Sequence, residues 1–166
     1  MSRFERFYPD YVYKSVWNIE DDFFEKNGIG FAILDIDNTL VPYTQKTPSK
    51  RALEFLQKLE KSGVKYCFLS NNKDKRVVLF NENIGAPFLA RAKKPLCGGV
   101  NKIMKMIGAK PENTVLIGDQ VFTDVWTGKR VGIKTVLVSP IEDKETLFFK
   151  FKRKMERIVL KNYNGR

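Results

Sequence analysis

A short apolar run that ends in two carboxylates constrains this chain more than any other feature. Residues 31–40 read FAILDIDNTL, so four apolar residues follow Gly30 and lead directly to Asp35 and Asp37. Such an uninterrupted run is typical of a strand that is buried on both faces, and these strands occur in parallel sheets covered by helices. Open parallel sheets bind ligands beyond the carboxyl ends of their strands, so we expect the chemistry of this chain at the two carboxylates.

Apolar runs and helical spacing alternate along the rest of the chain. The patterns predict strands at 31–34, 64–69, 88–90, 114–117 and 134–138, and helices from 47–49 to 63, at 74–82, from 95 to 107 and at 121–131. This alternation predicts a doubly wound parallel α/β sheet, that is, a Rossmann-like three-layer α/β/α fold. Because no repeat or linker divides the chain, residues 1–166 are expected to form one domain. Its expected parts are an aromatic N-terminal segment (1–29), an α/β core (30–140) and a basic C-terminal helix (141–166).

The expected strand ends carry groups suited to catalysis: Asp35 with Asp37, Ser70, Lys94, and Asp119 with Asp124. Two carboxylates this close repel each other unless a cation intervenes, and a hard divalent metal is the obvious one. The chain has no histidine, which excludes Ser-His-Asp and Cys-His catalysis and His-ligated zinc. Any chemistry must therefore use carboxylates, lysines and hydroxyls.

Each group also has a plain structural alternative. The Asp-x-Asp pair could be an acidic turn without a role, although a calcium loop is excluded because residues 38–41 lack its further ligands. Ser70 could begin a turn or cap a helix, Asp119 could be a turn residue, and Asp124 could lie in the first turn of a helix. These alternatives would all have to hold together, which favours a joint functional site.

The order of these groups resembles the motif series of the haloacid dehalogenase-like (HAD) phosphatases. The resemblance rests on the runs LDIDNT, LSN, KP and GDQVFTD, which begin at residues 34, 69, 94 and 118. The residues of these motifs are similar to those of the type IIIA branch, which contains the YqeG-type proteins. The resemblance spans about residues 30–140 and implies a HAD-like fold. The segments between the motifs have room for βα units and little more, so we expect no substantial cap domain.

Phosphoryl transfer needs cations, in-line positioning and an acid for the leaving oxygen. Asp35 is the expected nucleophile, which forms an aspartyl-phosphate, and Asp37 is the expected acid and base. Mg²⁺ would be held by the Asp35 carboxylate, the Asp37 backbone carbonyl and Asp119, with Asp124 as a direct or indirect ligand. Contacts to the phosphoryl oxygens are expected from Thr39, Ser70, Asn71 and Lys94. The proline after Lys94, as in the family pattern, selects it over Lys93.

The C-terminal segment 145–161 predicts a basic amphipathic helix. Apolar residues recur along one side at Leu147, Phe151, Met155 and Ile158, with Phe148 and Val159 beside them. Basic residues flank this side at Lys150, Lys152, Arg153, Lys154 and Arg157. Such a helix can lie on a membrane surface, or it can pack on its own sheet with its basic face in solvent. The aromatic residues of segment 4–13 can likewise form an interface, fill a core or fold over the site.

An uncapped site favours substrates that are bulky or presented on a surface. The net charge of +11 attracts anions, and together with the C-terminal helix it suggests a phosphate on an anionic phospholipid. The resemblance also extends to phosphatidylglycerophosphate phosphatases, which implies hydrolysis of phosphatidylglycerophosphate to phosphatidylglycerol. The alternatives are a phosphatase of protein, nucleic-acid ends or nucleotides, and a basic RNA- or ribosome-binding module with a vestigial site. Lacking a signal-peptide core or a run of about 20 apolar residues, the chain is expected in the cytoplasm, with peripheral association with the inner face of the membrane.

Overall fold

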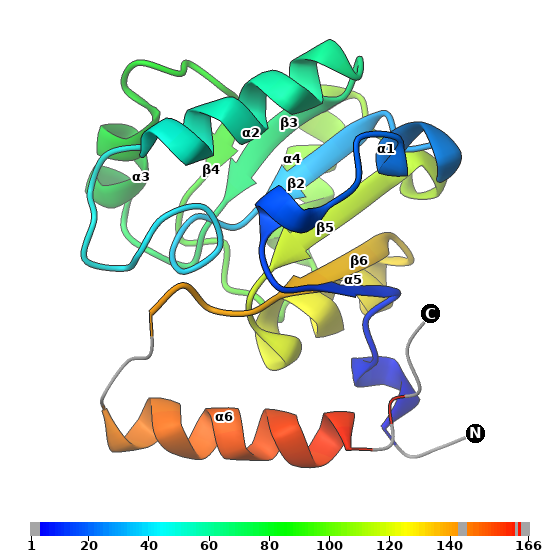
Figure 1. The fold of residues 1–166 in the computed structure, drawn as a ribbon, viewed down its shortest axis with the longest axis vertical. Helices are drawn as coiled ribbons and strands as arrows, with labels where there is room; N and C mark the ends of the chain where they lie inside the picture. The colour runs from blue at the N-terminus through cyan, green and yellow to red at the C-terminus, as the bar shows by residue number, and fades with distance from the viewer. Residues whose placement is uncertain (1–3, 143–145, 162, 164–166) are drawn as a thin grey trace.

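A six-stranded sheet, parallel at every pairing, forms the centre of the structure, with helices on both faces (Figure 1). The computed structural model describes residues 4–142, 146–161 and 163. The strands are β1 (Tyr11–Tyr13), β2 (Phe31–Leu34), β3 (Lys65–Leu69), β4 (Phe88–Leu89), β5 (Thr114–Gly118) and β6 (Lys134–Val138). The helices are α1 (Phe23–Lys26), α2 (Lys50–Lys61), α3 (Asp74–Asn81), α4 (Gly98–Ile107), α5 (Trp126–Val131) and α6 (Leu147–Leu160). The predicted three-layer α/β/α architecture is confirmed.

The apolar run that opens the motif is buried on both faces of the sheet. Ala32 and Leu34 of β2 belong to one core cluster, which includes Phe24 of α1 and residues of α2 and α3. Ile33, between them, belongs to the opposite cluster with Val100 of α4. Because side chains alternate along a strand, a strand covered by helices on both sides has to be apolar at every position. This requirement explains the unbroken run.

The strand order β1-β6-β5-β2-β3-β4 places a topological switch between β2 and β5. The chain proceeds from β2 through β3 to β4 on one side of β2, and then returns to β5 on its other side. Leu34 of β2 is in register with Phe68 of β3 and Ile117 of β5, so these strands end at nearly the same level. Crevices at such switch points are where open α/β sheets bind ligands. Asp35 and Asp119 follow the two strands that flank this switch.

Two predicted helices differ in detail from those observed. The helix expected over 121–131 begins with a π-helical turn, Val121–Val125, before α5. In this wide turn the N–H groups of Asp124 and Val125 both donate to the Gln120 carbonyl, at 2.9 and 3.2 Å. The helix expected from residue 95 begins at Gly98, because Leu96 N–H donates to the Lys93 carbonyl in a preceding turn.

The N-terminal aromatic segment fills the core at one edge of the sheet. The sequence pattern did not predict β1, which pairs with β6. Tyr11 and Tyr13 lie on the same side of β1 and pack edge-to-face on Phe23, with ring centroids 5.0 and 5.8 Å from it. Phe7 makes similar contacts with Trp126 at 5.2 Å. Of the alternatives for this segment, the described contacts favour core filling.

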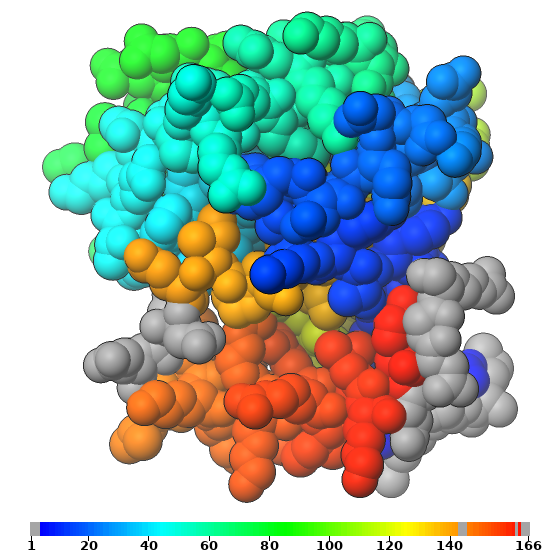
Figure 2. Space-filling model, viewed as in Figure 1, coloured from blue at the N-terminus to red at the C-terminus, as the bar shows by residue number. Residues whose placement is uncertain are grey.

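Helix α6 presents its apolar side to solvent. Leu147, Phe148, Phe151, Met155 and Ile158 form this apolar stripe. Leu147 is 85% exposed, Phe151 is 64% exposed and Ile158 is 49% exposed. Helix α6 does pack on the core, through Val159 in one cluster with Phe7, but the apolar stripe faces away from it. Figure 2 shows α6, in orange and red, along one end of the molecule. None of the described helices is both long and apolar enough to cross a bilayer.

Asp10 fastens the N-terminal segment to the sheet. Its carboxylate accepts hydrogen bonds from the backbone N–H (2.8 Å) and the hydroxyl (2.9 Å) of Thr135, and it pairs with Lys129. We expect Asp10→Ala to lower the free energy of unfolding by about 1 to 3 kcal/mol, because it leaves these partly buried donors unsatisfied. Urea denaturation would measure the loss. Asp22→Ala, which removes an exposed ion pair with Lys26, should cost less than about 1 kcal/mol. Equal losses would contradict the assignment.

Candidate active site

A buried lysine joins the strand ends into one site. Lys94 Nζ lies 2.9 Å from Asp35 Oδ1 and 2.6 Å from Asp124 Oδ1, and it donates to the Leu69 carbonyl at 3.0 Å. Burial lowers the pKa of Lys94, but the two carboxylates outweigh burial, so the pKa lies above its ordinary value and the amine is charged. Lys93, by contrast, is exposed. The lysine before the proline is thus the one that faces the carboxylates.

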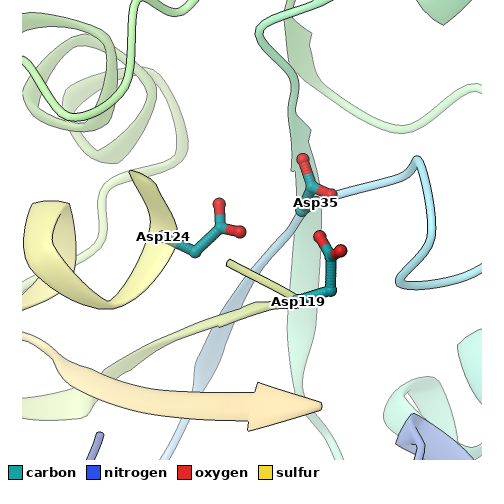
Figure 3. Close-up of side chains that lie close together, drawn as sticks. All are labelled: Asp35, Asp119 and Asp124. Atoms are coloured by element: carbon teal, nitrogen blue, oxygen red, sulfur yellow. The ribbon is translucent and has the colours of Figure 1, made fainter. Parts of the chain in front are cut away.

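Three carboxylates converge beside this lysine. Asp35, Asp119 and Asp124 form an acidic cluster in which one oxygen of each carboxylate lies within 4.8 Å of one oxygen of each of the others (Figure 3). Burial raises the pKa of Asp35 to about 8 and that of Asp119 to about 6, and the neighbouring carboxylates add to both shifts. Lys94 and Arg153 oppose these shifts but do not cancel them. Three carboxylates thus share this buried space with two cations, Lys94 and Arg153.

A divalent cation fits this acidic cluster. Asp119 Oδ1 is buried and has no hydrogen-bond partner among the described residues. A buried carboxylate oxygen without a partner is costly, and a hard cation with oxygen ligands would satisfy it. The other two carboxylates already accept hydrogen bonds at both oxygens, Asp35 from Lys94 and Thr39, and Asp124 from Lys94 and the Gln120 N–H. Asp119 is therefore the member of the cluster best placed to bind the metal, and a direct or indirect role of Asp124 stays a prediction.

Gly118 allows Asp124 to approach the sheet. A Cβ at this position would lie 2.2 Å from Asp124 Cγ, which is far inside van der Waals contact. The π-helical turn brings the Asp124 side chain back over the end of β5, and the glycine leaves room for it. The Gly-Asp run therefore serves two purposes. Asp119 belongs to the acidic cluster, and Gly118 makes space for the carboxylate of Asp124.

Asp37 lies apart from the acidic cluster and is held by two other residues. Arg76 of α3 contacts Asp37 Oδ1 through Nε (3.1 Å) and Nη2 (2.9 Å), and Asn72 donates to Asp37 Oδ2 at 3.0 Å. Arg76 also donates to the carbonyls of Gln45 and Lys46, so it ties α3 to the loop that follows β2. Sequence reasoning missed Arg76, because nothing local distinguishes it from the other basic residues of its helix.

The residues predicted to contact phosphate divide into two groups. Thr39 Oγ1 donates to Asp35 Oδ2 at 3.1 Å, and the Asn71 carboxamide bonds to the backbone N–H (2.7 Å) and carbonyl (2.9 Å) of Lys94. These two side chains therefore position Asp35 and Lys94, and their contact with a phosphate stays a prediction. Ser70 Oγ accepts from the Asn72 N–H at 3.0 Å, which leaves its own proton to be donated.

Helix α6 contributes two residues that the sequence pattern placed outside the site. Arg153 donates to Asp119 Oδ2 (2.5 Å), to the Asp119 carbonyl (2.7 Å) and to Glu156 Oε2 (2.8 Å). The buried Glu156 accepts from the Val121 N–H at 3.0 Å. Helical periodicity shows which residues share a side of α6, but it does not show which partners that side meets. These contacts hold α6 against the end of β5.

A cleft of about 840 Å³ lies between α6 and the loops after β2 and β5. The loops contribute Asp37, Asn38 and Gln120 to its wall. Helix α6 and the residue after it contribute Lys150, Arg153, Lys154, Arg157, Ile158 and Lys161. Its volume suits a ligand of the size of a small organic molecule. Because Asp37 lines it, the cleft opens directly at the candidate site.

Comparisons with known proteins agree on one family. The model of the HAD-hydrolase-like family matches residues 91–153. The chain is 34% identical over 154 residues to the probable phosphatase YqeG of Bacillus subtilis, covering 93% of this chain and 90% of that protein. It is 27% identical over 168 residues to phosphatidylglycerophosphate phosphatase 1 of Arabidopsis thaliana. This alignment covers 93% of the chain but 47% of the plant protein, so the chain spans about half its length.

Solved structures share the fold at low sequence identity. A 4-nitrophenylphosphatase from Thermotoga maritima superposes with a TM-score of 0.58 at 16% identity, over 72% of this chain and 89% of that one. The cobalt-bound deoxy-D-mannose-octulosonate 8-phosphate phosphatase from Haemophilus influenzae gives a TM-score of 0.51 at 18% identity, over 81% and 89% of the two chains. These likenesses confirm the HAD-like fold.

Removing Asp119 should abolish stabilisation by Mg²⁺. A cation at 100 times its dissociation constant stabilises the folded state by about 2.7 kcal/mol, which raises the Tm of a domain of this size by about 5 to 10 °C. We expect this rise in the wild-type protein, measured by thermal unfolding with Mg²⁺ against EDTA, and its loss in Asp119→Asn. Asp74→Asn, which changes an exposed carboxylate on α3, should keep it. A rise of the same size in Asp119→Asn would place the metal elsewhere.

Proposed function

The chain belongs to the HAD-like phosphatases of the YqeG type, and from that premise we propose that it removes the terminal phosphate of phosphatidylglycerophosphate at a membrane surface. The single observation that carries the lipid substrate is the apolar stripe of α6, which is open to solvent beside the cleft that leads to Asp37.

The hydrolysis divides into two displacements at phosphorus. In the first, an oxygen of Asp35 attacks the phosphorus, the bond to the ester oxygen breaks, and Asp37 gives a proton to the leaving oxygen. In the second, water attacks the aspartyl-phosphate while Asp37 takes its proton, which releases inorganic phosphate and restores Asp35. Lys94, 2.9 Å from Asp35, and the free proton of Ser70 would stabilise the phosphoryl oxygens throughout.

The separation of the two motif carboxylates supports these roles. Asp35 is buried between Lys94 and Thr39, which fix both of its oxygens. Asp37 is held at the wall of the cleft by Arg76 and Asn72. A nucleophile has to be aimed at the phosphorus, whereas an acid and base has to reach the leaving group and water.

Mg²⁺ is the proposed cofactor of this site. The Asp35 and Asp119 carboxylates and the Asp37 backbone carbonyl would hold it, with Asp124 behind them. When bound, Mg²⁺ supplies positive charge that offsets the repulsion between the carboxylates and the phosphate. The unpaired Asp119 Oδ1 and the raised pKa values of Asp35 and Asp119 support a cation there.

Peripheral binding to a membrane would bring the lipid phosphate to the cleft. Large apolar side chains on one side of a helix, flanked by lysines, suit the boundary between anionic headgroups and acyl chains. Phe148 and Phe151 are 69% and 64% exposed, and Lys150 and Lys154 lie beside them. The similarity to the plant phosphatidylglycerophosphate phosphatase, although distant, supports the same substrate.

Nucleic-acid ends are the second candidate substrate, because the cations of the cleft would also attract a phosphodiester backbone. The apolar stripe has no use in that function, and neither do protein or nucleotide substrates require it. A basic module with a vestigial site is disfavoured by the complete set of Asp35, Asp37, Lys94 and Asp119.

A panel of substrates tests the proposed activity. We expect Mg²⁺-dependent release of phosphate to be fastest from phosphatidylglycerophosphate in anionic vesicles, compared with nucleotides, sugar phosphates and 5′-phosphorylated oligonucleotides. Asp35→Asn should lower this release by about 10³-fold or more, because it removes the nucleophile. Good activity on nucleotides without activity on the lipid would overturn the proposed substrate while leaving the phosphatase chemistry in place.

Membrane binding should depend on the aromatic residues of the apolar stripe. We expect the double variant Phe148→Ser/Phe151→Ser to lower the fraction of protein that floats with anionic liposomes by about 10-fold, because it removes two large insertable side chains. The matched control is Val78→Ser/Met106→Ser, which changes two exposed apolar residues on α3 and α4. Flotation that is equal in both variants would show that α6 does not bind the membrane.

A further inference from the structure

One side of α6 carries a row of basic residues toward the cleft. Lys150, Lys154 and Arg157 recur at intervals of four and three residues, and Lys161 follows at the end of the helix. These spacings place the four side chains on one side of the helix, and all four line the cleft. We call this set the cationic stripe. It lies between the apolar stripe and the inward side, where Arg153 and Glu156 contact the site.

The cationic stripe faces the place where a leaving group would emerge. In the proposed reaction, Asp37 gives a proton to the leaving oxygen, so the leaving group has to lie on the Asp37 side of the phosphorus. Asp37 lines the cleft, and the cationic stripe forms the opposite wall. The part of a substrate beyond its scissile oxygen would therefore extend along α6.

We propose that the cationic stripe binds a second anionic group, a phosphodiester, that the substrate carries in its leaving group. This inference rests on the proposed function and adds to it the feature of the substrate that α6 recognises. The preferred substrate is then a phosphomonoester whose alcohol part bears a phosphodiester and an apolar portion. Phosphatidylglycerophosphate has this composition, since its leaving alcohol is phosphatidylglycerol.

The charges along the cleft support a bound anion. No carboxylate among residues 4–142, 146–161 and 163 forms an ion pair with any of the four side chains of the cationic stripe. Arg153, one turn away from Arg157, is by contrast paired with Asp119 and Glu156. The acids on the cleft wall are Asp37, which Arg76 holds, and Glu142, which accepts a hydrogen bond from Thr44. No described carboxylate thus neutralises the cationic stripe, and its positive charges are available to a ligand.

The position of Ile158 favours a lipid leaving group over a nucleic acid. Ile158 lines the cleft and also belongs to the apolar stripe, so the two surfaces are continuous along α6. A lipid in a membrane that meets the apolar stripe would present its phosphodiester at the level of the headgroups, beside the lysines. A nucleic acid would meet the cationic stripe but would leave the apolar one in water.

Substrate selectivity tests this inference without a membrane. The first substrate is glycerophosphoglycerophosphate, the deacylated headgroup, and the second is glycerol 3-phosphate, which lacks the phosphodiester. The measured quantity is the ratio of kcat/KM for the first substrate to that for the second. We expect Lys154→Gln/Arg157→Gln to lower this ratio by about 10- to 100-fold, as is usual when charge-assisted hydrogen bonds are removed.

A matched control separates local binding from net charge. Lys102→Gln/Lys105→Gln removes two exposed positive charges from α4 and should leave the ratio unchanged. If both double variants lower the ratio equally, the effect is general electrostatic attraction and the inference is wrong. If the ratio for a 5′-phosphorylated oligonucleotide over a mononucleotide falls more steeply than the headgroup ratio, the lipid assignment is overturned.

A binding measurement keeps the inference independent of turnover. Glycerophosphoglycerol carries the phosphodiester without a phosphomonoester, so it binds the proposed subsite and cannot be hydrolysed as a monoester. Titration calorimetry should show about 10-fold weaker binding to Lys154→Gln/Arg157→Gln than to the wild-type protein. Equal affinities would overturn the subsite even if the enzyme is active. A folded wild-type protein that hydrolyses no monoester but binds this probe through the stripe would overturn the proposed function alone.

Discussion

Burial of the Lys94 amine between Asp35 and Asp124 is the constraint on which the rest of the site depends. Burying these charges costs several kcal/mol for each ion, and good geometry has to offset this cost. The surrounding structure supplies it, since Asn71 fixes the Lys94 backbone, Gly118 leaves room for Asp124 and the π-helical turn directs that side chain inward. Removal of one partner would leave a buried charge uncompensated. Lys94 thus connects Asp35 after β2, the Leu69 carbonyl of β3 and Asp124 after β5.

The same constraint explains how the carboxylates differ in environment. In the acidic cluster three carboxylates lie beside Lys94 and Arg153, and burial, together with the neighbouring carboxylates, raises the pKa values of Asp35 and Asp119. Arg76 and Asn72 hold the Asp37 carboxylate away from this cluster. Asp35 and Asp37, with one residue between them, therefore have different surroundings: Asp35 is buried, whereas Asp37 lies at the wall of an open cleft. Separation of this kind lets two identical side chains perform different tasks.

Much of the fold and part of the site could be predicted from the sequence, because they follow from local patterns. Strand β2 is apolar at every position and its neighbours are largely apolar. Asp35, Ser70, Lys94 and Asp119 follow strands or short connections, so topology alone brings them together. Strand β1 was missed, because three residues with alternating burial give little periodic signal. The contacts of Arg76 and Arg153 were missed for a different reason, since each meets a carboxylate more than 30 residues away in sequence. Such pairings depend on tertiary structure, which a local pattern does not contain.

The orientation of α6 follows from the cost of leaving buried acids without partners. A rotation of the helix that buried the apolar stripe would take Arg153 away from Asp119 and Glu156 away from the Val121 N–H. The Asp119 carboxylate and the Val121 N–H would then lie buried without these partners, which is more costly than leaving apolar surface exposed. The inward contacts therefore fix the rotation of α6 about its axis. The helical repeat then determines the directions in which its other two sides face. Because Arg153 faces the site, the cationic stripe has to face the cleft and the apolar stripe has to face outward. The ion pair between Arg153 and Asp119 thereby determines which side of α6 is exposed.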